Sequence, residues 1–140
     1  MDNTTKKPYA SLSTRIKAVF IDAVILILLM YSATLILDAF ESVPNYVRTI
    51  VFVFLFFLYE PVLVASYGAT IGHFFSDIVV KSKTDETKNI SFPMAIVRYA
   101  LKYLLGWLSL LTVSGSENKQ AIHDMAANAV VKPYEKLKKQ

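Results

Sequence analysis

The 140-residue sequence contains no cysteine, which excludes a disulfide-stabilised scaffold and any metal site built on thiolates. Charge is also scarce, because only 19% of the residues are charged, against about 25% in a typical soluble domain. Low charge with 54% hydrophobic residues excludes a disordered chain. The mean hydropathy of +0.43 and the 13% of aromatic residues exceed what one small core can bury. The composition therefore indicates a protein of the lipid bilayer.

Two long apolar runs predict transmembrane helices. Residues 18–37 form a run of twenty with one ionisable side chain, Asp22, and a helix of that length covers about 30 Å, the thickness of the hydrocarbon core. The second run, residues 46–67, carries Glu60 in its second half. A short polar break separates the runs, so we expect an antiparallel helix hairpin. A cleaved signal peptide is the competing interpretation of the first run, but the run is too long and contains a carboxylate.

The third apolar run, residues 92–113, contains two basic side chains. Arg98 and Lys102 would each cost about 2.5–3.5 kcal/mol at the centre of a membrane helix, and the charge-free remainder is eleven residues long. We therefore expect either a tilted span whose two cations reach the interface, or an interfacial or re-entrant helix. Residues 114–140 are predicted to form a cytoplasmic tail.

Short β-branched runs lie outside the apolar segments. Residues 78–80 are one such run, and two pairings are open to it: a local hairpin with the apolar patch at Ile90, or a strand pair with residues 129–132. The predicted fold is thus a single, mainly α, integral membrane domain over residues 1–140. It combines the transmembrane hairpin, a third apolar helix and a small cytoplasmic β element.

The distribution of basic residues predicts the orientation in the membrane. Four basic residues precede the first run, whereas the break over residues 38–45 has none and contains two acids. The positive-inside rule then predicts a multi-pass protein of the cell membrane with a cytoplasmic amino terminus. The basic carboxyl-terminal end favours contact with anionic lipid headgroups over nucleic-acid binding. The basic residues at the two ends are Lys6, Lys7, Arg15, Lys17, Lys136, Lys138 and Lys139.

Two carboxylates within the apolar runs are candidate functional groups. Asp22 and Glu60 fall at similar depths of the expected hairpin, where two acids could hold either a proton or a cation. The alternative is a structural charge network, in which Arg15, Arg98 and Lys102 neutralise the two acids. A third interpretation is that the acids face an oligomer partner.

No pattern typical of an enzyme is present. The two histidines lack the spacing of a metal site, and the sequence has neither a Gly-rich phosphate loop nor a G-x-S-x-G nucleophile motif. We therefore expect no enzymatic activity, no metal and no cofactor.

The joint order of several short motifs resembles the RDD family of small integral membrane proteins, named for one arginine and two aspartates. The matching positions are Arg15 at the start of the first helix, Asp22 within it, and Asp124 in the tail. A loop motif after the second helix also matches, at Gly68, Thr70 and Gly72. The chain departs from the family pattern at Ala69 and His73, where glutamine and lysine are usual, and at Asn128-Ala129, where a glycine-threonine pair is usual. The resemblance implies membrane residence and a role in transport, without naming a substrate.

Two functions from different classes follow from these features. In the first, the protein is a transport component that moves a small cation against protons, with Asp22 and Glu60 as the titrating pair. Two or three helices cannot enclose a pathway, so transport requires a homo-oligomer or a membrane-protein partner. In the second, the protein is a non-transporting membrane accessory or assembly subunit, whose charges match those of another protein.

Overall fold

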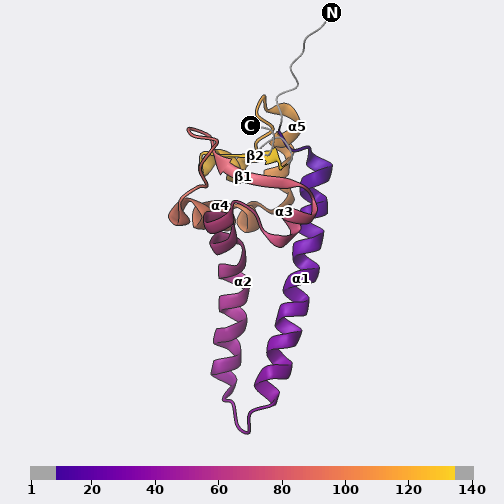
Figure 1. Cartoon of the computed structure of the whole chain (residues 1–140), viewed down its shortest axis with the longest axis vertical. Coiled ribbons are helices and arrows are strands. Elements are labelled where there is room, and N and C mark those ends of the chain that lie inside the picture. Colours follow the sequence, from indigo (N-terminus) through magenta and orange to yellow (C-terminus); the bar gives the residue numbers. More distant parts are fainter. Residues whose placement is uncertain (1–8, 135–140) are drawn as a thin grey trace, which may run out of the picture.

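A long helical hairpin joined to a smaller head makes up the structure, a computed structural model that describes residues 9–134 (Figure 1). We call residues 68–134 the head. The lysines predicted to form basic clusters at the extreme ends, Lys6 and Lys7 and those from 136 onwards, lie outside the described residues.

The hairpin consists of α1 (Leu12–Asp38) and α2 (Asn45–Tyr67). The 27 residues of α1 and the 23 of α2 correspond to about 40 Å and 35 Å of helix, enough to cross a bilayer. The side chain of Ser11 caps α1 by accepting a hydrogen bond from the backbone N–H of Thr14. The two long helices confirm the predicted hairpin. Because α1 begins six residues before the apolar run, Arg15 lies on this helix.

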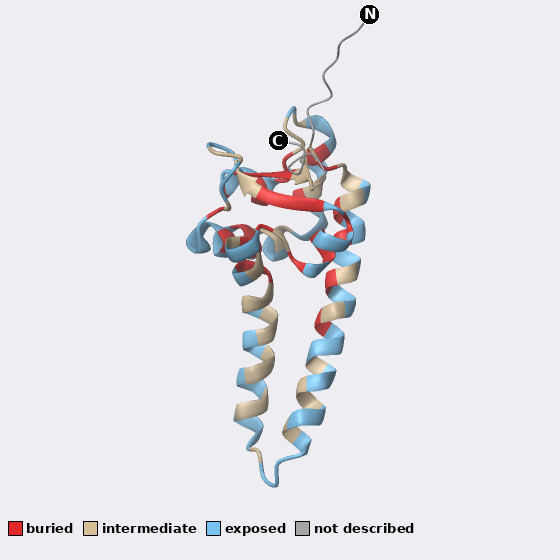
Figure 2. Ribbon diagram, viewed as in Figure 1, coloured by how far each residue is buried: buried red, intermediate tan, exposed pale blue. Residues whose placement is uncertain are grey.

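The hairpin buries three charged side chains and exposes many apolar ones. Figure 2 shows that buried residues gather in and near the head, whereas the far part of both helices is exposed or half-buried. Exposed side chains there include those of Val24, Ile27, Phe54 and Phe57. The buried residues of α1 are Arg15, Ala18, Asp22 and Leu26, and those of α2 are Glu60, Pro61 and Val64. An apolar exterior of this extent requires lipid as its solvent.

The head lies at the end of the hairpin where α1 begins and α2 ends (Figure 1). Its elements in chain order are α3 (Ile71–Phe75), β1 (Ile78–Ser82), α4 (Phe92–Leu105), the 3₁₀ helix η1 (Gly106–Leu111), α5 (Thr112–Gly115), α6 (Ile122–Ala126) and β2 (Ala129–Pro133).

The two strands pair with each other across more than forty residues of sequence. They run antiparallel, with Ile78 opposite Pro133 and Ser82 opposite Ala129. The backbone N–H of Ala10 donates to Val131, which ties the chain before α1 to the sheet. The predicted pairing of the two β-branched runs is therefore confirmed. The alternative hairpin is wrong, because Ile90 is buried in a loop and belongs to no strand.

The third apolar segment does not form one continuous helix. By length and hydropathy, Phe92–Gly115 qualifies as a third candidate span beside α1 and α2. Its helical course changes at Gly106, which has φ 55° and ψ −135°, so α4 has only 14 residues and extends about 21 Å. Figure 1 shows α4 lying across the end of the hairpin rather than alongside it. This geometry favours the interfacial or re-entrant alternative.

Candidate functional site

A buried network of ion pairs lies where α1, α2, α4 and α6 meet. Arg98 is its centre: Nε donates to Asp124 Oδ1 over 2.8 Å, and Nη1 donates to Glu60 Oε1 over 2.6 Å. Arg15 donates from Nη1 to the other oxygen of Asp124, and Lys102 donates from Nζ to Glu60 Oε2 over 2.7 Å. Both arginines and both acids are at most 5% exposed.

Local structure explains how these side chains come together. Arg98 and Lys102 are four residues apart on α4, so they lie on the same face of the helix and both reach Glu60. Asp124 lies in the first turn of α6, where its Oδ2 also accepts a hydrogen bond from the backbone N–H of Ala121. The basic residues of the apolar third segment are thereby paired rather than exposed to lipid, which removes most of the cost of burying them.

Asp22 occupies a separate cage of neutral donors. Its carboxylate accepts hydrogen bonds from the hydroxyl of Tyr59 at 2.8 Å, the hydroxyl of Thr70 at 2.6 Å and the backbone N–H of Gly72 at 2.8 Å. Asp22 is 6% exposed, and it makes no ion pair with any side chain in residues 9–134. The aspartate is thus a buried acid whose partners carry no charge.

The three residues of the loop motif have distinct structural roles. Gly68 ends α2 in the left-handed region, with φ 75°, and its carbonyl accepts from Val80 of β1. The hydroxyl of Thr70 also accepts from the backbone N–H of His73 and so caps α3. Gly72 lies so close to α1 that an added Cβ would be 2.2 Å from the carbonyl oxygen of Ala18. These contacts bring α3 to within hydrogen-bonding distance of α1.

Asp22 and Glu60, the candidate pair, belong to different hydrogen-bond systems. Within the described residues no hydrogen bond or ion pair joins them directly. The two systems are adjacent in α2, where Tyr59, which donates to Asp22, directly precedes Glu60. The structure therefore places both acids at the head end of the hairpin, with neutral partners around one and basic partners around the other.

Several residues of the site have no clear signal in the sequence. Tyr59 lies in a run of phenylalanines, where its hydroxyl is the only hint of a polar role. Ser109 and His123 are both buried, and the hydroxyl of Ser109 lies 2.5 Å from His123 Nδ1. His73 accepts a hydrogen bond at Nδ1 from the backbone N–H of Thr70. Residues 9–134 contain no group of three His, Asp or Glu side chains arranged to hold a metal ion.

Burial and neighbouring charges set the protonation of the head. Burial, together with the nearby charge of Arg98, lowers the pKa of His73 to about 3. Burial also lowers the pKa of His123 to about 3, although Asp124 opposes that shift. For Asp124, burial alone would raise the pKa, but the guanidinium groups of Arg15 and Arg98 outweigh it and hold the pKa well below its usual range. Both histidines are therefore neutral in the folded protein at pH 6.

These two pKa values predict acid lability. The unfolded chain takes up a proton at each histidine below pH 6.5, whereas the folded chain does so only near pH 3, so stability falls as the pH drops through 6.5. We expect the free energy of unfolding in detergent micelles to decrease by about 3 kcal/mol between pH 7.5 and 5.5. Replacing both histidines with glutamine should flatten this slope, and an equally steep slope in that variant would contradict the assignment.

Comparison with known proteins gives one match. The model described as the RDD family matches residues 9–128, a range that contains the hairpin, the ion-pair network and the cage around Asp22. Comparison with curated proteins and with solved structures gives no match.

Proposed function

The chain belongs to the RDD family, and from its site we propose that it is a transport component in which Asp22 exchanges a proton for a small cation. The protein is a multi-pass membrane protein. One observation carries the proposal: among the described residues, the hydrogen-bond donors to the buried carboxylate of Asp22 in α1 are all neutral. Ionisable groups in that position mark ion or proton pathways more often than they serve packing.

The cage suits both states of such an exchange. A buried carboxylate without a basic partner lowers its electrostatic cost either by binding a proton or by binding a cation. The hydroxyl oxygens of Tyr59 and Thr70, beside the carboxylate of Asp22, are oxygen ligands of the kind that hard cations prefer. Glu60 is assigned to the ion-pair network instead, because Arg98 and Lys102 already neutralise it. Of the two acids predicted from the sequence, our proposal therefore retains Asp22 alone.

Proton movement in vesicles tests this role. With the purified protein reconstituted alone, external sodium or potassium should drive protons across the membrane, and Asp22→Asn should reduce that exchange at least about tenfold. The matched control is Asp38→Asn, because Asp38 ends the same helix and its side chain is 56% exposed. Exchange that persists unchanged in Asp22→Asn would remove this residue from the mechanism.

We propose that the pathway forms in a homo-oligomer. Two crossing helices enclose no pathway, and the hairpin exposes apolar side chains over most of its length. The accessory-subunit alternative has less support. That role requires charges that are left for another protein, whereas Arg15, Arg98 and Lys102 each pair with a carboxylate of their own chain.

We further propose two membrane crossings, with the amino terminus and the head in the cytoplasm of the cell. Because the sequence contains no cysteine, cysteines introduced one at a time can report the topology. Lys83→Cys before α4 and Ser114→Cys after η1 should react with an impermeant maleimide from one side, and Glu41→Cys in the hairpin loop from the other. If the third segment crossed the membrane, the labels at positions 83 and 114 would appear on opposite sides.

A further inference from the structure

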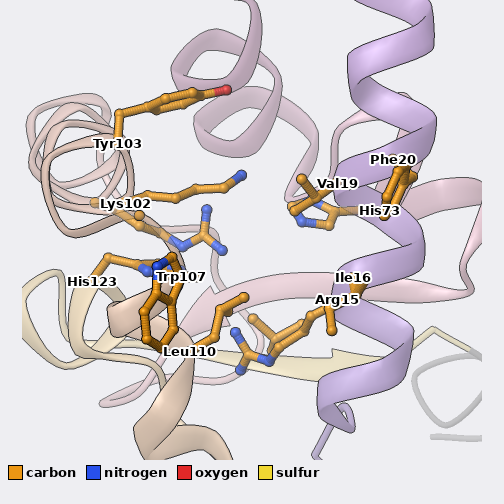
Figure 3. A pocket seen from close by; sticks show the side chains of 13 residues that line it. Arg15, Ile16, Val19, Phe20, His73, Lys102, Tyr103, Trp107, Leu110 and His123 are labelled. Atoms are coloured by element: carbon orange, nitrogen blue, oxygen red, sulfur yellow. The ribbon is translucent and has the colours of Figure 1, made fainter.

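A cavity of about 400 Å³ lies between the start of α1 and the α4–η1 segment, apart from the cage of Asp22 (Figure 3). Its polar lining consists of basic residue types: Arg15, Arg98, Lys102, His73 and His123. Its apolar lining includes Val19, Phe20, Tyr103 and Trp107. Among the described residues, no carboxylate lines the cavity, because Asp124 and Glu60 lie behind the basic side chains that they pair with.

The basic side chains keep hydrogen-bond donors that the network does not use. Arg15 donates from Nη1 to Asp124 and from Nη2 to the carbonyl of Lys119, and its buried Nε has no hydrogen-bond partner within residues 9–134. Arg98 donates through Nε and Nη1, and no contact within residues 9–134 uses its Nη2. Lys102 uses one of its three N–H donors in the hydrogen bond to Glu60. Figure 3 shows Lys102 from α4 and Arg15 from α1 reaching toward the same space from opposite sides.

The apolar part of the wall opens toward the surroundings of the hairpin. Phe20 is 70% exposed and Trp107 is 71% exposed, so the apolar wall of the cavity reaches the outer surface of the molecule. Tyr103 and Trp107 are aromatic residues of the type that collects at the membrane interface. The cavity thus has cationic donors in its interior and apolar side chains at its opening.

We propose that this cavity binds the phosphate headgroup of an acidic phospholipid, with the acyl chains leaving between Phe20 and Trp107. A phosphate diester carries one negative charge and only acceptor oxygens, which matches a lining whose charged groups, Arg15, Arg98 and Lys102, are all donors, and arginine recognises such groups well. The volume accommodates a headgroup but not the acyl chains, so the chains must extend into the bilayer. This inference is independent of the transport role of Asp22.

A variant that fills the cavity without changing its charges tests the proposal. Val19 lines the cavity, so Val19→Trp should occupy the headgroup space. Val24→Trp, on the same helix at a position 55% exposed and outside the lining, is the matched control. After reconstitution in equal amounts of phosphatidylglycerol and phosphatidylcholine, we expect native mass spectrometry to find phosphatidylglycerol enriched about tenfold on the wild type and on Val24→Trp.

Val19→Trp should lose this enrichment, and thermal unfolding provides the second readout. Phosphatidylglycerol should raise the unfolding temperature of the wild type and of Val24→Trp but not of Val19→Trp, which a general effect of anionic lipid would not reproduce. Equal enrichment in both variants, or none in the wild type, would overturn the proposal. Stabilisation by inorganic phosphate as large as that by phosphatidylglycerol would assign the cavity to free phosphate and overturn the lipid as its ligand.

Discussion

Replacing Arg98 with methionine is expected to destabilise the protein by about 3–5 kcal/mol. Methionine keeps an unbranched side chain of moderate length but leaves Asp124 and Glu60 with one basic partner each. Both acids are buried, at 0% and 4% exposure, so neither can turn to water for compensation. The free energy of unfolding in mixed micelles, followed by circular dichroism during titration with a denaturing detergent, measures the loss.

Arg48→Met is the matched control for that experiment. Arg48 also pairs with an aspartate, Asp38, but the two side chains are 28% and 56% exposed. Exposed pairs contribute little, so this variant should lose no more than about 1 kcal/mol. Equal losses in the two variants would show that burial does not give the network at Arg98 its importance.

Gly72→Ala should be the most damaging of the small substitutions, with an expected loss of about 3 kcal/mol. The new Cβ would lie 2.2 Å from the backbone oxygen of Ala18 and 2.6 Å from Asp22 Cγ. Because one of these atoms belongs to the backbone of a helix, α3 must move away from α1. That movement breaks the hydrogen bond from the N–H of Gly72 to Asp22. The melting temperature in detergent should therefore fall, and the environment of Asp22 should change with it.

Gly115→Ala controls for the loss of a glycine. Beyond its immediate neighbours in the chain, no described residue comes within 4 Å of the Cβ that this change would add, so its stability should stay within about 0.5 kcal/mol of the wild type. If Gly72→Ala were as stable as Gly115→Ala, the close packing of α3 against α1 would not hold in the protein.

The hairpin could be predicted from the sequence because crossing a bilayer depends on local properties, the length and hydropathy of a segment. The ion pairs were foreseen only as one of three interpretations, a network in which Arg15, Arg98 and Lys102 neutralise Asp22 and Glu60. In the structure Arg98 and Lys102 pair with Glu60, whereas Arg15 pairs with Asp124. The pairing of β1 with β2 could also be predicted, because both runs are β-branched and bounded by turns. Asn128 supports this, as it adopts the left-handed conformation, with φ 51°, directly before β2.

The cage around Asp22 could not be predicted in the same way. Its donors lie 37, 48 and 50 residues away in the sequence, and they meet only because α2 and the start of α3 both pack against α1. The course of residues 92–113 was also open, since the segment is long and apolar enough to span. The chain leaves the course of α4 because of the backbone conformation of one residue, Gly106. The hydropathy of the segment does not predict this conformation.

The central claim is that Asp22 exchanges its proton for a cation, and infrared difference spectroscopy on the reconstituted protein tests it most directly. Adding sodium or potassium at constant pH should decrease the carboxylic C=O stretch and increase the carboxylate bands. This change should be present in Asp38→Asn and absent in Asp22→Asn. A spectrum that does not respond to the cation, or that responds equally in Asp22→Asn, would contradict the claim.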